Sequence, residues 1–136
     1  MDFDQFQKRC QKTARPPLTS QRNCEALNYA ILALAGEAGE LANVWKKALR
    51  DGYGYAVGGS DDMPRQGDGT LAAGTLLVMP DRRDQLLEEL GDVLYYVAAV
   101  ASCLLVPLDD VAKENIEKLA GRYDVPLDDV SEPSQS

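Results

Sequence analysis

The chain has 136 residues, and its 14 lysines and arginines are outnumbered by 22 aspartates and glutamates, which gives a formal net charge of -8. This length fits one domain. The acidic balance argues against a duplex nucleic-acid binder, whose affinity comes largely from basic side chains that neutralise phosphates. Histidine is absent, which excludes serine-histidine and cysteine-histidine catalysis.

The three cysteines form no Cys-x-x-Cys pair, so neither a disulfide framework nor a zinc site is expected. The start of the chain does not combine basic residues with an apolar stretch, and the longest apolar run, residues 93–106, is interrupted by tyrosines and Ser102. That run is too short for a membrane span. We therefore expect no membrane segment and a cytoplasmic location.

Four segments carry helical patterns. The first is expected from Asp2 or Asp4 to Ala14, because its acidic start suits a helix N-terminus and prolines follow its end. The second is expected from about Asn23 to about Leu49, where apolar residues recur along one stripe.

The segment from residue 52 to residue 80 is different, because it holds seven of the eleven glycines. It predicts a long loop or a small β-hairpin arm. A third helix is expected over residues 81–104 and a fourth from Leu108 to residues 120–123, with Asp109 or Asp110 as its N-cap. Residues 124–136 are polar and contain prolines, which is typical of a flexible tail.

These elements predict an all-α fold with four main helices. The expected single domain covers residues 1–123 and includes the insertion at residues 52–80.

Two acidic pairs carry most of the functional information. Glu37 and Glu40 lie in the second predicted helix, and Glu89 and Asp92 lie in the third. Each pair is spaced i,i+3, so both carboxylates of a pair project from one helix face. Small and apolar residues surround both pairs, and residues 30–44 contain no lysine, which a solvated helix face would normally carry.

Two like-charged pairs that face each other repel strongly unless cations lie between them. Magnesium, a hard cation that prefers oxygen ligands, is the expected ion, and manganese is an alternative. Three glycines next to the acids, Gly36, Gly39 and Gly91, each disfavour a helix interior by about 1 kcal/mol relative to alanine. They predict close approach of backbone, metal or ligand. For either pair taken alone, a solvated acidic face remains the alternative interpretation.

The motifs Glu-Ala-Gly-Glu-Leu-Ala and Glu-Glu-Leu-Gly-Asp-Val-Leu-Tyr-Tyr resemble those of the MazG-like, all-α nucleoside triphosphate pyrophosphohydrolases. The signature of that family is Glu-x-x-Glu on one helix and Glu-x-x-Asp on the next. The opening Phe-Asp-Gln-Phe-Gln-Lys-Arg, the Lys46-Lys47 pair and the run Asn115-x-x-Lys118-Leu-x-x-x-Arg122-Tyr123 also look like family positions. The resemblance covers residues 1–123 outside the insertion.

The resemblance implies a magnesium-dependent enzyme that cleaves (deoxy)nucleoside triphosphates between the α- and β-phosphates, releases pyrophosphate and controls the nucleotide pool. It also implies an antiparallel bundle of the four main helices, assembled as a homo-oligomer that is either a dimer or a tetramer. Carboxylate-bound magnesium can neutralise phosphate charge and activate water, as this reaction requires. The implied catalytic and metal-binding residues are Glu37, Glu40, Glu89 and Asp92, one glutamate of which could instead orient or deprotonate the attacking water.

The implied contacts to the triphosphate are Asn115, Lys118 and Arg122. Lys47 lies about two helical turns beyond Glu40 and is best placed to reach the groove between the second and third predicted helices. The alternative is that Lys47 only interacts favourably with the helix dipole, as a lysine near a helix C-terminus does. Base recognition is not assigned.

Three aromatic residues, Trp45, Tyr95 and Tyr96, are interpreted as core or subunit-interface residues, with base stacking as the alternative. Two other functions stay open: a catalytically silent helical oligomerisation or protein-binding module, and a hydrolase of another phosphoanhydride. The gap between the motifs is longer than expected for compact members of the family. The glycine-rich insertion accounts for it and could be a lid, an arm that contacts a neighbouring subunit, or a disordered insert.

Overall fold

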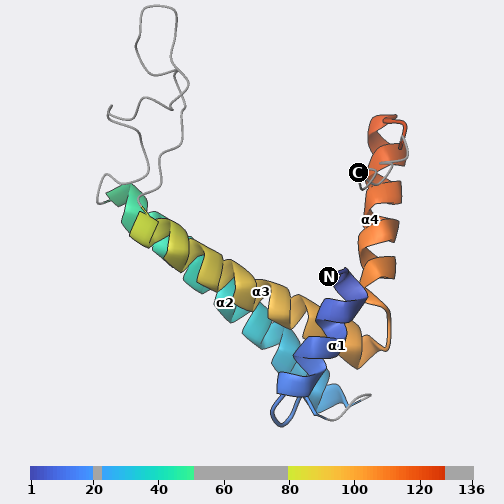
Figure 1. Ribbon diagram of the computed structural model, residues 1–136, viewed down its shortest axis with the longest axis horizontal. Helices are drawn as coiled ribbons and strands as arrows, with labels where there is room; N and C mark the ends of the chain where they lie inside the picture. Colours follow the sequence, from blue (N-terminus) through green and yellow to red (C-terminus); the bar gives the residue numbers. More distant parts are fainter. Residues whose placement is uncertain (20–22, 51–79, 128–136) are drawn as a thin grey trace, which may run out of the picture. The chain divides into compact units, whose positions relative to one another are not determined.

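A computed structural model describes residues 1–19, 23–50 and 80–127 (Figure 1). These residues contain no strand and form four helices: α1 (Phe3–Thr13), α2 (Cys24–Arg50), α3 (Pro80–Leu104) and α4 (Leu108–Tyr123). The predicted all-α class is confirmed for this part of the chain. The loop or hairpin arm predicted for residues 52–80 lies outside the described residues, except for Pro80 at the start of α3.

The helices belong to two compact units. Unit 1 comprises Met1–Leu27 and Ala98–Ser136, and unit 2 comprises Asn28–Val97. Unit 1 therefore contains α1, α4, the first turn of α2 and the last turns of α3. Unit 2 contains the rest of α2 and α3, including both acidic pairs. The antiparallel four-helix bundle, the single domain over residues 1–123 and the flexible tail remain predictions.

Helix α1 forms where the sequence predicts it because both of its ends carry suitable residues. Asp2 is the N-cap, and its Oδ1 accepts a hydrogen bond of 2.6 Å from the backbone N–H of Gln5. Acidic Asp4 lies in the first turn and basic Lys12 in the last, as the helix dipole favours. Two side chains of this helix, Gln7 and Cys10, are buried.

Gln7 joins α1 to the turn between α3 and α4. Its Nε2 donates to the carbonyl of Val106 at 2.9 Å and to Ser102 Oγ at 3.2 Å. Its Oε1 accepts from the backbone N–H of Leu108 at 3.0 Å. Within this turn Leu105 has a positive φ of 59°, a conformation that a branched residue adopts only when its surroundings hold it there. Gln7 supplies part of that support.

The N-terminus of α4 differs from the prediction that Asp109 or Asp110 caps it. Pro107 occupies the N-cap position and makes no side-chain cap bond. Instead, Asp4 Oδ1 accepts from the backbone N–H of Asp109 at 3.1 Å, and Asp109 Oδ1 accepts from the backbone N–H of Phe3 at 3.1 Å. Each helix start is thus satisfied by an acid of the other helix, a tertiary arrangement that local sequence does not reveal.

The buried apolar positions are occupied mainly by small side chains: Cys10, Ala26, Ala30, Ala48, Ala98, Ala101, Cys103 and Leu108. Many larger apolar side chains are substantially exposed, among them Ile31 and Leu32 on α2, Leu87 and Leu90 on α3, and Ile116 on α4. Among the described helices, no single one is long and apolar enough to cross a membrane, although α3 and α4 pass that length and composition test together as a bent pair.

We predict that Gln7→Ala lowers the free energy of unfolding by about 2–4 kcal/mol, because three hydrogen bonds are lost and the buried N–H of Leu108 is left without its acceptor. Urea denaturation followed by circular dichroism measures this change. The matched control is Gln5→Ala, an exposed glutamine on the same helix, expected to change stability by no more than about 0.5 kcal/mol. Equal stability of the two variants would contradict this role of Gln7.

Candidate functional site

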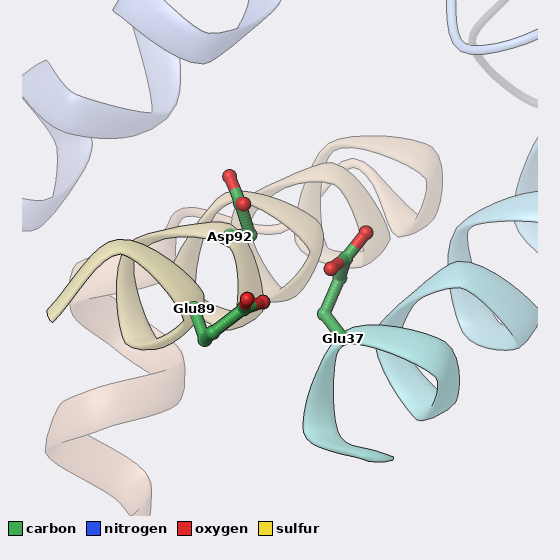
Figure 2. Close-up of side chains that lie close together, drawn as sticks. All are labelled: Glu37, Glu89 and Asp92. Carbon is green, nitrogen blue, oxygen red and sulfur yellow. The ribbon is translucent and has the colours of Figure 1, made fainter. Parts of the chain in front are cut away.

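Three of the four predicted acids converge in unit 2. Figure 2 shows Glu37 of α2 beside Glu89 and Asp92 of α3, with the three side chains close together. One carboxylate oxygen from each residue lies within 4.8 Å of the other two. Glu37 and Glu89 are half-buried, whereas Asp92 is exposed. We call these three residues the acid triad.

The triad forms because of the register between the two helices. The contacts of unit 2 pair an early residue of α2, Tyr29, with a late residue of α3, Tyr96. They also pair the later Glu37 of α2 with the earlier Glu89 and Asp92 of α3. Since Glu89 and Asp92 are spaced i,i+3, both reach the side of α3 that faces α2.

Glu40, the fourth predicted acid, is exposed and is not part of the triad. Its charge nevertheless acts on Glu89 and raises the pKa of that carboxyl group. Glu40 therefore lies close enough to the triad to share its electrostatic field.

Glu89 is the acid whose pKa these neighbouring charges raise. Desolvation raises the pKa of Glu89, and the charges of Glu40, Glu37, Asp92 and Glu88 raise it further, in that order. A raised carboxyl pKa means that the surroundings disfavour the negative form. A proton on Glu89 or a cation beside it relieves the repulsion.

The glycines near the acids were expected to mark a close approach of backbone, metal or ligand; within the described chain they do not mark an approach of backbone, and the approach of a metal or ligand remains a prediction. A β-carbon added at Gly36, Gly39 or Gly91 would meet nothing within 4 Å. The reason is that all three glycines lie on exposed parts of their helices. Space is therefore open beside the acids on both α2 and α3.

The triad has the properties of a hard-cation site. Its donors are all carboxylate oxygens, which suit Mg²⁺, Mn²⁺ or Ca²⁺ better than softer metals. Two oxygens on opposite sides of one Mg²⁺ lie about 4 Å apart, so oxygens within 4.8 Å of one another need only side-chain rotation to share an ion. Among the described residues, the ion pairs Arg83–Asp84 and Lys113–Glu117 involve none of these carboxylates.

The predicted phosphate-binding residues lie on two helices. Lys47 is exposed near the end of α2, in the same unit as the triad. Asn115, Lys118 and Arg122 are exposed on α4 in unit 1, spaced so that they share one helix face. The structure does not place unit 1 relative to unit 2, so a role for these three residues near the triad remains a prediction.

Tyr29, which the sequence analysis did not single out, pairs with Tyr96 beside the triad. The ring centroids of Tyr29 and Tyr96 lie 6.5 Å apart, and the rings are tilted by 56°. Burial raises the pKa of Tyr96 to about 12, with the neighbouring Tyr29 and the nearby charge of Glu37 adding to the shift, so Tyr96 stays neutral at ordinary pH. The sequence does carry one sign of this pair, the spacing of the tyrosines from the acids: Tyr29 precedes Glu37 by eight residues, and Tyr96 follows Asp92 by four.

Comparison with known proteins identifies the family of this chain. The family model of the MazG nucleotide pyrophosphohydrolase domain matches residues 26–125, a span that contains both acidic pairs. The gene 37 protein of Mycobacterium phage L5 is 38% identical over 100 residues, which cover 74% of this chain and 68% of that protein. The uncharacterized protein YvdC of Bacillus subtilis (strain 168) is 34% identical over 91 residues, which cover 67% of this chain and 70% of YvdC. The chain is therefore a member of the MazG nucleotide pyrophosphohydrolase domain family.

Proposed function

We propose that this protein is a magnesium-dependent pyrophosphohydrolase that converts (deoxy)nucleoside triphosphates to the monophosphates and pyrophosphate, and so limits the nucleotide pool. The observation that carries the proposal is the convergence of Glu37, Glu89 and Asp92 from two helices, in a chain of this family. Acidic side chains that served only solubility would not need to lie this close together, where they repel one another.

The triad would hold the metal ion. Its all-oxygen donor set supports Mg²⁺, with Mn²⁺ as a substitute. When bound, such an ion supplies charge neutralisation on the phosphate oxygens and lowers the pKa of coordinated water.

Hydrolysis forms one bond and breaks one bond. The water oxygen bonds to the phosphorus of the α-phosphate, the bond from that phosphorus to the α–β bridging oxygen breaks, and pyrophosphate leaves. The proton released by the water needs an acceptor. Glu40 is suited to this role because it lies outside the triad but shares its field. The alternative role for Glu40 is that of a fourth metal ligand.

The cationic and amide side chains would bind the triphosphate. Lys47 is exposed on the helix that carries Glu37, which supports a contact with a phosphate. We assign the same role to Asn115, Lys118 and Arg122 on α4. Homo-oligomerisation is supported by the exposed large apolar side chains of α2, α3 and α4.

Removing one charge from the triad should stabilise the metal-free protein. The pKa of Glu89 is raised above its unfolded value, so the folded state binds this proton more tightly and the charged form destabilises the fold as pH rises. In EDTA at pH 7, Glu89→Gln is expected to melt at a higher temperature than the wild type, and the difference should shrink toward pH 4. Glu88→Gln, the exposed neighbour, is the control with the smaller effect. A lower melting temperature for Glu89→Gln at pH 7 would contradict the repulsion.

Removing a triad ligand should abolish the reaction. With Mg²⁺ and a panel of nucleoside triphosphates, Glu37→Gln and Asp92→Asn are each expected to lower the rate of pyrophosphate release by about a hundredfold or more. Both variants should also lose the Mg²⁺-induced rise in melting temperature, because fewer carboxylates remain to hold the ion.

The matched control for this assay is Glu88→Gln, which removes a carboxylate next to the triad and should keep both properties. Pyrophosphate and orthophosphate are assayed separately, since orthophosphate as the sole first product would move the cleavage point. No turnover with any nucleotide and no Mg²⁺-induced stabilisation would favour a silent helical module.

The role of Glu40 can be separated from that of the triad. If Glu40 accepts the proton, Glu40→Gln should lower kcat by about a hundredfold while the Mg²⁺ dissociation constant, measured by calorimetry, changes little. Weakened Mg²⁺ binding in Glu40→Gln would assign it as a fourth ligand instead.

A further inference from the structure

Three tyrosines cluster in unit 2 beside the acid triad. The ring centroids of Tyr29 and Tyr96 lie 6.5 Å apart, and those of Tyr95 and Tyr96 lie 5.2 Å apart with the rings edge to face. Both separations are typical of favourable aromatic pairs. Tyr95 and Tyr96 are half-buried, whereas Tyr29 is 46% exposed. Tyr29 thus has an orientation supported by its neighbours and a ring that remains open to contact.

The tyrosines and the acids share one face of α3. Tyr96 follows Asp92 by four residues and Glu89 by seven, spacings that place all three on one side of a helix. Asp92 and Tyr96 are about 6 Å apart along the helix axis. The charge of Glu37 also reaches the Tyr96 hydroxyl. The aromatic pair therefore adjoins the triad on the side that faces α2.

We propose that the exposed ring of Tyr29 stacks on the base of the bound nucleotide, and that Tyr96 positions Tyr29 through the contact between their rings. This inference rests on the proposed function, because the triad must hold the phosphate end of the same molecule. Tyr29 lies eight residues before Glu37, about 12 Å along α2.

The contact defines a substrate class. Stacking uses the π face that every base has, so it is tolerant of base identity. Tyr29 therefore binds nucleotides as a class, with purines gaining more from the larger overlap, and it does not by itself select one base. Selection among bases requires hydrogen bonds from other residues.

The test measures kcat and KM for pyrophosphate release from a purine nucleoside triphosphate. Tyr29→Ala is expected to raise KM about tenfold or more, with kcat within about threefold of the wild type, because the lost contact lies away from the reacting phosphates. Tyr29→Phe keeps the ring and should stay within about threefold of the wild-type KM. Ribose 5-triphosphate has no base, so wild type and Tyr29→Ala should cleave it with equal KM.

The matched control is Ile31→Ala. Ile31 is 49% exposed, close to the exposure of Tyr29, but lies about 200° around α2 from it. Its replacement should leave KM unchanged. Melting temperatures and size-exclusion profiles of all variants accompany the kinetics.

The positioning role of Tyr96 is tested by a double-mutant cycle. Tyr96→Ala removes the ring that contacts Tyr29 and should raise KM about threefold in the wild-type background. It should have no further effect in the Tyr29→Ala background, where the ring contact is already absent. An equal effect in both backgrounds overturns the positioning role.

A Tyr29→Ala variant that stays folded and keeps the wild-type KM overturns the stacking proposal, while the proposed function stands because the wild type still releases pyrophosphate. A changed oligomeric state in this variant would assign the ring to a contact between copies and also overturn it. Absence of wild-type turnover, by contrast, would reject the proposed function itself.

Discussion

Repulsion among neighbouring carboxylates is the constraint on which the proposed function of this protein depends. Two helices bring Glu37, Glu89 and Asp92 close together, and the charge of Glu40 adds to the repulsion on Glu89. Folding alone gives no reason for this arrangement, since it raises the pKa of Glu89 and disfavours its charged form. In the proposed metal site, a divalent cation would convert the same repulsion into binding energy, because each carboxylate would then face a positive charge. The close carboxylates would therefore lower the stability of the metal-free protein and raise its affinity for a metal ion.

The part of the chain that holds α1 and α4 relies on polar contacts more than on a large apolar core. The buried positions are mostly alanine, serine and cysteine, which contribute little apolar area each. Gln7 connects α1 to the α3–α4 turn, and Asp4 and Asp109 satisfy the first backbone N–H groups of each other's helices. This network fixes the start of α4, the helix that carries Asn115, Lys118 and Arg122.

Local patterns predicted much of this structure and missed what tertiary contacts decide. The helix bounds followed from caps, prolines and apolar periodicity, and the i,i+3 spacing correctly indicated that Glu89 and Asp92 share a face of α3. The α4 cap was wrong because Asp109 bonds to α1, and no local rule reveals a partner more than a hundred residues away. The exclusion of Glu40 from the triad depends on inter-helix register, which the spacing within one helix does not determine. The contact between Tyr29 and Tyr96 was missed for the same reason, since the two residues lie on different helices.

The most direct test of the central claim is the position of a bound divalent ion. Crystals of the protein grown with Mn²⁺ and a non-hydrolysable nucleotide give an anomalous signal from the metal alone. We predict a peak between α2 and α3, within coordination distance, roughly 2.2 Å, of carboxylate oxygens of Glu37, Glu89 and Asp92. A fully loaded crystal with manganese bound elsewhere, and with these three side chains turned away from one another, would contradict the account.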